Sequence, residues 1–178
     1  MRLYVTNTLG VIHMVENNEI DIGIVEGPIN NKNLVTEVCW QDELLLVTPP
    51  GHALSGPDSV KPNEVMQYPF ISREEGSGTR QVISEYLTEN NLSFSDMILA
   101  MEFGSSESIK SAVAAGLGIS ILSIATLDKE ISLGLLEKIS LTPSLKRPFT
   151  IVYQKQKFRL RAMEEFLVFA KEQAAKIG

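Results

Sequence analysis

Short apolar runs alternate with amphipathic stretches along the chain. The runs at residues 20–25, 43–48 and 119–122 have the length and the β-branched content of buried strands. The stretches at residues 8–17 and 81–89 place apolar side chains three or four positions apart, as on one face of a helix. This alternation of strands and helices predicts an α/β fold.

The beginning of the chain predicts a strand–helix–strand unit. Residues 3–5 and 20–25 are the two strands, and the helix at residues 8–17 lies between them. We therefore expect a parallel pair with a right-handed crossover. Ligands bind beyond the carboxyl ends of the strands in such sheets. The residues at these ends are Thr6, Asn7, Glu26 and Gly27.

The remaining chain continues the same alternation. Further strands are predicted at residues 97–103, 134–139 and 149–154. Further helices are predicted at residues 61–66, after Ser105, after Ser123 and at 160–176. Two polar breaks, Gln41-Asp42 and the loop at residues 143–148, are interpreted as hinges.

A glycine-bracketed serine stands at the start of one predicted helix. Residues 75–80 read Glu-Gly-Ser-Gly-Thr-Arg, and they follow the apolar run at residues 69–71. Glycine lets the backbone approach a ligand closely. The free N–H groups of a first helical turn and the helix dipole both favour an anion there. This stretch is therefore the strongest candidate for a binding site.

Composition and charge exclude several classes of protein. The chain has 178 residues, of which 44% are hydrophobic, and its net charge is −6. A core of ordinary size is expected, and a surface for nucleic acid, which needs clustered Lys and Arg, is not. With one cysteine, Cys39, no internal disulfide can form. Two histidines and one cysteine make a zinc site unexpected, and no other metal or cofactor is expected.

We expect neither a membrane span nor a leader peptide. No stretch approaches the roughly 18 apolar residues that a span needs. The first five residues, Met-Arg-Leu-Tyr-Val, lack a basic region that leads into an apolar run. They resemble a strand already under way. We therefore expect a cytoplasmic protein, and a chain that is part of a longer one.

Several motifs, in a fixed order, resemble one family. They are residues 19–27, 44–54, 69–80, 106–119 and 147–153. Each is weak alone, but together they extend over nearly the whole chain. In this order they resemble the effector-binding domain of LysR-type transcriptional regulators.

The resemblance implies a fold like that of type II periplasmic binding proteins. Two α/β lobes would be joined by two crossover strands, with an effector bound between them. Lobe I would comprise residues 1–41 and 148–178, and lobe II residues 42–147. The family's first strand and helix start are absent here, as is its DNA-binding helix-turn-helix. We therefore expect exposed strand edges in lobe I, with self-association through that gap or a loosened lobe.

The implied partners are a small metabolite and further copies of the chain. The effector would be a carboxylate, a sulfate-like or a phosphorylated compound, and DNA would be contacted only through the absent domain. Hydroxyl and backbone N–H groups at helix starts are the expected contacts. These are Ser77, Gly78, Thr79, Ser105 and Ser106 in lobe II and Thr6, Asn7 and Thr8 in lobe I.

Two arginines near these helix starts are further candidates. Arg73 and Arg80 could each add a bidentate contact to an anion. The alternative interpretation is that the hydroxyls only cap their own helices and that the arginines are solvated. Both interpretations remain open from the residues alone.

The sequence leaves two rival functions, an enzyme and the solute-binding protein of a transporter. An enzyme would need a base beside Ser77, and only His13 and His52 are available. The stretch at residues 76–79 also lacks the lysine of a phosphate-binding loop. A transporter's solute-binding protein would share the fold, but the absent leader peptide argues against it. We expect a sensor and no catalytic residues.

Overall fold

The chain divides into two compact units, which are described separately. The computed structural model describes residues 2–27, 29–155 and 161–177. Unit 1 comprises Met1–Gln41, Gly76–Gly78 and Arg147–Gly178, and unit 2 comprises Asp42–Glu75 and Thr79–Lys146. The short segment Gly76–Gly78 thus belongs by its contacts to unit 1, although the residues on both sides of it belong to unit 2.

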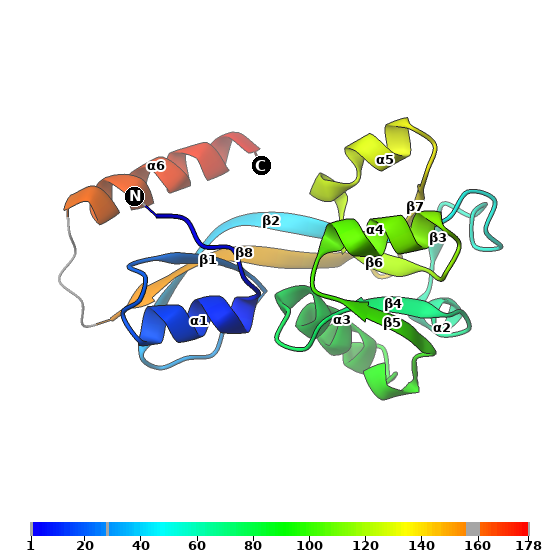
Figure 1. The fold of residues 1–178 in the computed structure, drawn as a ribbon, viewed down its shortest axis with the longest axis horizontal. Coiled ribbons are helices and arrows are strands. Elements are labelled where there is room, and N and C mark those ends of the chain that lie inside the picture. Colours follow the sequence, from blue (N-terminus) through cyan, green and yellow to red (C-terminus); the bar gives the residue numbers. More distant parts are fainter. Residues whose placement is uncertain (1, 28, 156–160, 178) are drawn as a thin grey trace. The chain divides into compact units, whose positions relative to one another are not determined.

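The elements are those of a mixed α/β protein, as predicted (Figure 1). The strands are β1 (Gly23–Glu26), β2 (Leu34–Thr48), β3 (Ser59–Val60), β4 (Phe70–Arg73), β5 (Leu99–Phe103), β6 (Ser120–Ser123), β7 (Glu137–Leu141) and β8 (Leu145–Gln154). The helices are α1 (Thr8–Glu16), α2 (Pro62–Val65), α3 (Gly78–Glu89), α4 (Ser106–Ala114), α5 (Asp128–Ser132) and α6 (Arg161–Ile177).

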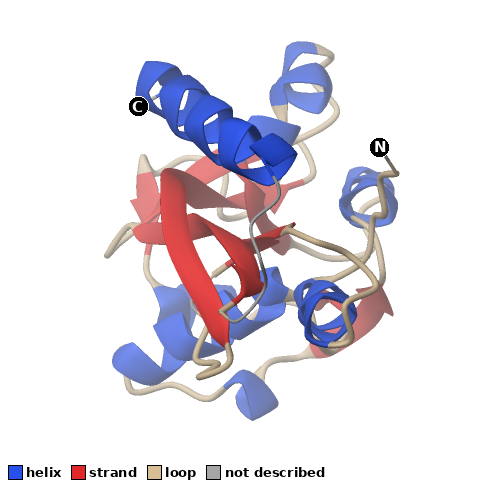
Figure 2. Cartoon of the chain, turned by 90° about the vertical axis from the view of Figure 1, so that its left-hand side faces the viewer, coloured by secondary structure: helices blue, strands red, loops and turns tan. Residues whose placement is uncertain are grey.

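Helices cover both faces of the unit 1 sheet (Figures 1 and 2). Val152 of β8 packs with Val15 of α1 in one cluster. Its neighbour Ile151 packs with Met163 of α6 in another. Since successive side chains of a strand point to opposite faces, α1 and α6 lie on opposite sides of β8. Leu160, where we expected the last helix to begin, lies outside the described residues.

A glycine in β1 sets the distance between α1 and the sheet. A Cβ atom at Gly23 would lie 2.3 Å from Cγ1 of Val11 and 3.0 Å from Cγ2 of Val152. No real side chain fits in that space. The absence of a side chain at Gly23 therefore lets α1 pack directly on the strand.

The predicted parallel pair at the start of the chain is wrong. Residues 2–7 form no strand, and Leu3 and Val5 are 82% and 91% exposed. β1 instead pairs antiparallel with β8, from Gly23 opposite Val152 to Glu26 opposite Phe149. The apolar run at residues 3–5 therefore has strand-like composition without forming a strand.

Two predicted breaks lie inside long strands. β2 is one strand of 15 residues, although unit 1 ends at Gln41 and unit 2 begins at Asp42. The loop predicted at residues 143–148 is wrong over most of its length, because β8 begins at Leu145. Pro148 lies within this strand, and its carbonyl accepts a hydrogen bond of 2.9 Å from the N–H of Gly27.

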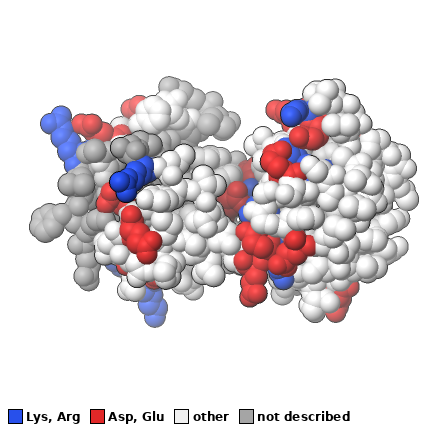
Figure 3. Space-filling view, in the orientation of Figure 1, with Lys and Arg blue, Asp and Glu red and all other residues white. Residues whose placement is uncertain are grey.

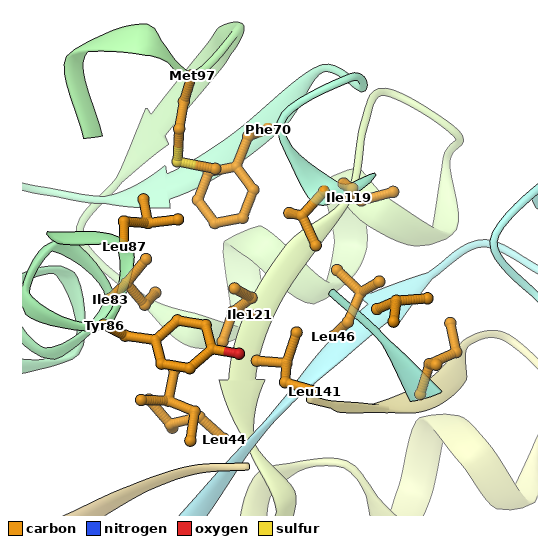
Figure 4. Close-up of a cluster of buried hydrophobic side chains, with 14 of the residues drawn as sticks. Leu44, Leu46, Phe70, Ile83, Tyr86, Leu87, Met97, Ile119, Ile121 and Leu141 are labelled. Carbon is orange, nitrogen blue, oxygen red and sulfur yellow. The ribbon is translucent and has the colours of Figure 1, made fainter. Parts of the chain in front are cut away.

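Unit 2 is built on the second half of β2. This half pairs antiparallel with both β6 and β7, and β3 joins β7 in parallel. β4 and β5 form a separate parallel pair. The main apolar cluster lies between the β2 part of the sheet and α3, where the aromatic rings of Phe70 and Tyr86 lie among aliphatic side chains (Figure 4). The apolar stripe predicted for α3, which comprises Val82, Ile83, Tyr86 and Leu87, is buried as expected.

Candidate functional site

The start of α1 contacts Gly76–Gly78, the part of the glycine-bracketed stretch that belongs to unit 1. Asn7 caps the helix, because its side-chain oxygen accepts a 2.9 Å hydrogen bond from the N–H of Gly10. The N–H of Leu9 donates to the carbonyl of Gly76 over 3.1 Å. The Oγ1 atom of Thr8 donates to the carbonyl of Glu26 over 3.4 Å. The structure thus brings together three of the predicted positions, Asn7, Thr8 and Gly78, with Glu26.

Both glycines of the stretch are needed for this contact. Gly76 has φ +85°, a conformation that side chains of L residues rarely adopt. A Cβ atom at Gly78 would lie 2.1 Å from the carbonyl oxygen of Glu26 and 2.6 Å from Oγ1 of Thr8. Only a residue without a side chain can lie there. In the structure, the backbone at Gly78 therefore packs directly against Glu26 and Thr8.

An ion pair between a buried arginine and a partly exposed glutamate lies at the end of β1, beside this contact. Arg147 is 2% exposed, and its Nη1 atom lies 2.6 Å from Oε2 of Glu26. The guanidinium of Arg147 also lies 5.3 Å from the centre of the Phe149 ring, which stacks on Trp40. The sequence placed Glu26 near a site but gave no signal for this pair, since 121 positions separate the two residues.

In unit 2 the predicted arginines lie next to carboxylates. Arg73 pairs with Glu74, its neighbour in sequence, over 2.8 Å. Arg80 pairs with Glu102 of β5, and its guanidinium lies 5.0 Å from the centre of the Phe94 ring. Neither arginine is simply solvated. The negative partners offset the charge that we expected these arginines to offer to an anion.

Ser105 caps α4 as predicted. Its Oγ atom accepts a 3.2 Å hydrogen bond from the N–H of Ser108 and lies 2.9 Å from the Ser108 hydroxyl. Ser106 is the first residue of the helix. Arg73 lies opposite Phe103 in the parallel pair of β4 and β5, so the turns after these strands leave at the same edge. Thr6 is exposed, in the extended segment before α1.

Depth of burial separates the predicted serine and threonine residues. Ser77 and Thr79 are each 4% exposed, whereas Ser105 is exposed and Ser106 is half-buried. The rival histidines lie elsewhere: the ring of His13 is within 3.1 Å of Asn17, and His52 packs edge-on against Tyr68. Burial lowers the pKa of His52 from its usual value.

The surface and a pocket in unit 1 add little to the site. Lys and Arg side chains are scattered on the face shown in Figure 3 and form no basic patch there. A pocket of about 310 Å³ in unit 1 contains none of the predicted site residues. It is lined by Glu16, Lys32, Asn33, Leu34, Gln154 and Lys155.

Among the residues that the structure describes, no group of three or more His, Cys, Asp or Glu side chains is arranged to hold a metal ion. In the same residues, no helix is both long enough and apolar enough to cross a membrane.

The fold and the sequence together define the family. The model for the LysR substrate binding domain matches residues 1–175. The chain therefore belongs to this family, as the motifs indicated. The HTH-type transcriptional regulator YeiE of Escherichia coli K12 is 35% identical over 169 residues, which cover 94% of this chain and 56% of that protein. The RuBisCO operon transcriptional regulator of Allochromatium vinosum is 28% identical over 99% of this chain and 58% of its own length.

Solved structures agree with this assignment. The regulatory domain of CcmR from Synechocystis PCC6803, in complex with 2-PG, is 28% identical and superposes with a TM-score of 0.87. That match covers 97% of this chain and 82% of the other. The effector binding domain of QuiR, at 20% identity and a TM-score of 0.84, shares the fold. The chain spans just over half the length of the curated relatives it matches.

Proposed function

We propose that this chain is the effector-sensing part of a LysR-type transcriptional regulator. It binds a small anionic metabolite, and the bound state alters how the whole regulator acts on DNA. The observation that most strongly supports this proposal is the glycine-bracketed helix start that holds Ser77 and Thr79. Its presence in a domain similar to one solved with 2-PG supports a carboxylate, sulfate-like or phosphorylated effector.

The wider proposal concerns how the domain works in its parent protein. The two compact units support the proposed regulatory lobes, residues 1–41 with 148–178 and residues 42–147. An effector shifts a regulator between states by its different affinity for each of them. We place the regulator in the cytoplasm, as a homo-oligomer that contacts DNA through a separate domain. Sensing without catalysis agrees with relatives that are transcriptional regulators.

A binding experiment tests this proposal. A thermal-shift screen of carboxylate, phosphorylated and sulfur-containing metabolites, 2-PG included, identifies a ligand, and calorimetry then measures its affinity. Ser77→Ala combined with Thr79→Ala removes two candidate hydroxyl donors. We expect the affinity to fall about tenfold or more, which is the effect of losing one or two hydrogen bonds to a charged ligand.

The matched control lies on the same helix. Ser84→Ala combined with Thr88→Ala makes the same chemical change farther along α3, where Thr88 Oγ1 donates only to the Ser84 carbonyl. This control should leave the affinity unchanged. Equal affinities in both double variants, with both still folded by circular dichroism, would refute the assignment of Ser77 and Thr79.

A further inference from the structure

The two arginines of unit 2 that were predicted as site residues differ in which guanidinium atoms are occupied. Arg73 donates from Nε and Nη2 to the two carboxylate oxygens of Glu74, over 2.8 and 3.1 Å. These atoms form the side-on edge of the guanidinium, where two parallel N–H groups fit two oxygens of one anion. Glu74 therefore already fills the position at Arg73 that a bound carboxylate or phosphate would take.

Arg80 is bonded through the other end of its guanidinium. Its Nη1 atom donates to the carboxylate of Glu102 and, over 3.4 Å, to the carbonyl of Arg73. These two bonds use both N–H groups of Nη1. The Nε–H and Nη2–H groups of Arg80 make no hydrogen bond to the residues that the structure describes. The side-on edge that Arg73 gives to Glu74 is thus open at Arg80.

This open edge of Arg80 reaches solvent. Within the described part of the chain, every buried side-chain nitrogen atom has a hydrogen-bond partner. Since Nε and Nη2 of Arg80 have no such partner there, these two atoms are not buried, and the side chain of Arg80 is 25% exposed. A ligand dissolved in water can therefore reach both groups.

Three contacts hold the guanidinium of Arg80 in place. Glu102 and the Arg73 carbonyl bind Nη1, and the guanidinium carbon lies 5.0 Å from the centre of the Phe94 ring. These partners come from β5, from the end of β4 and from the turn Phe94–Asp96. A side chain that is ordered before binding loses less conformational entropy when a ligand arrives. The open edge is therefore presented in a preformed orientation.

Arg80 lies across the carboxyl ends of the parallel strands β4 and β5. Its Nη1 atom reaches the carbonyl of Arg73, the last residue of β4, and Glu102 lies next to the last residue of β5. Ligands of α/β proteins bind beyond such strand ends. Every residue of this arrangement belongs to unit 2.

We propose that Arg80 contacts the effector, by donating from Nε and Nη2 to two oxygens of one anionic group, and that Arg73 does not. This inference rests on the proposed function, because it names one contact of the same effector. Carboxylate, phosphate and sulfate groups all offer two oxygens that fit the side-on edge of a guanidinium. The pair of Arg73 with Glu74 stays intact when the effector binds.

Matched lysine variants test this assignment. Arg80→Lys keeps the positive charge and removes the planar pair of donors, and Arg73→Lys makes the same change at the other arginine. Inorganic phosphate is the probe, titrated by calorimetry into the unmodified chain and into both variants. We expect the affinity to fall about tenfold or more in Arg80→Lys, through the lost hydrogen bonds to a charged ligand. The affinity of Arg73→Lys should be unchanged.

The side-chain N–H signals of the unmodified chain give a second measurement, which does not depend on the folding of a variant. In a heteronuclear NMR titration with phosphate, the Nε–H signal of Arg80 should shift. Its exchange with water should slow about tenfold, as expected for the gain of one hydrogen bond. The Nε–H signal of Arg73 is the internal control and should not change, because that group already donates to Glu74.

The outcomes separate the two proposals. The Arg80 contact is overturned, and the sensing function stands, if phosphate binds Arg80→Lys as tightly as the unmodified chain, binds both variants equally weakly, or leaves the Arg80 signal unchanged. The same conclusion follows if phosphate does not bind but a compound of the metabolite screen does. If neither phosphate nor any compound of that screen binds the unmodified chain, both proposals are overturned.

Discussion

Lys110 of α4 joins three parts of unit 2 through one buried ammonium group. Its Nζ atom donates to the Thr126 carbonyl over 2.9 Å and to Glu130 over 3.0 Å, and it lies 2.8 Å from Glu107. Burial by itself would lower the pKa of Lys110, but the bonds to the two carboxylates outweigh it, so the pKa is raised. The hydrogen bond from Lys110 lowers the pKa of Glu130. The charged pair is therefore the stable form in the folded chain.

Replacement of this lysine should destabilise unit 2. Lys110→Met keeps the aliphatic stem but leaves the Thr126 carbonyl and Glu130 without their ammonium donor. We expect a loss of about 2 kcal/mol in the free energy of unfolding, measured by urea denaturation. Glu107→Gln is the control, since the Glu107 side chain is 77% exposed and its pairing should contribute little. Equal effects of the two variants would contradict the role of burial.

Tyr86 should make the stability of unit 2 depend on pH. Its hydroxyl donates to the Pro143 carbonyl over 2.7 Å, and burial raises its pKa to about 12. The neutral phenol is thus favoured by folding. The raised pKa of Tyr86 therefore contributes to the free energy of unfolding. This contribution is fully present below the unfolded pKa of 10.0 and is lost as pH rises from there towards about 12.

Substitution of Tyr86 separates these effects. Tyr86→Phe should lower the free energy of unfolding by about 1 kcal/mol at pH 7, through the lost hydrogen bond. It should also flatten the fall in stability above pH 10, as followed by circular dichroism. If the free energy of unfolding falls equally above pH 10 in the variant, groups other than Tyr86 cause the loss of stability.

Local contacts were the part of the site that could be predicted at this scale. Asn7 and Ser105 each cap a helix through an amide three positions further along the chain. Both partners of such a hydrogen bond can be read from a short stretch of sequence. The pairing of Arg80 with Glu102 joins residues 22 positions apart, and folding alone decides it. The sequence therefore indicates the arginines as candidates but not the carboxylates that offset their positive charge.

Among the elements, α4 offers a direct test of a predicted cap. Ser105→Ala removes the side-chain acceptor for the Ser108 amide. We expect a loss of about 1 kcal/mol, typical of an N-cap serine, with faster hydrogen exchange in the first turn only. Ser111→Ala in the same helix is the control and should be neutral or slightly stabilising, since alanine is the better helix former. Uniform exchange along α4 in both variants would contradict capping by Ser105.

Strand pairing was the least predictable property of the elements. The runs at residues 20–25 and 149–154 were both recognised as strand-forming, but nothing local indicates that they pair with each other. The loop predicted at residues 143–148 ends at Pro148, and proline cannot donate a hydrogen bond to a neighbouring strand. The carbonyl of Pro148 nevertheless bonds to Gly27, which lets β8 continue through this position. β1 and β8 are more than a hundred residues apart, so their pairing depends on the whole fold.

At the scale of the whole molecule, β2 can report on the stability of both units. Its residues in unit 2 include Leu44–Val47, which are all buried, whereas its residues in unit 1 alternate between buried or partly buried and exposed positions. The clusters packed on the unit 2 part are also larger. We expect amides at residues 44–47 to exchange more slowly than those at residues 35–38. Equal protection along β2 would instead show that the chain opens as one cooperative unit.

The order of segments in unit 1 has a consequence for synthesis on the ribosome. β1 needs β8 as its partner, and Glu26 lies opposite Phe149. At about 5–20 residues per second, translation separates these two positions by roughly 6–25 seconds. All of unit 2 emerges during that interval and has time to fold around β2. The newly made β1 and α1 meanwhile wait with apolar surface uncovered, so a chaperone that binds the nascent chain should act on these first 41 residues.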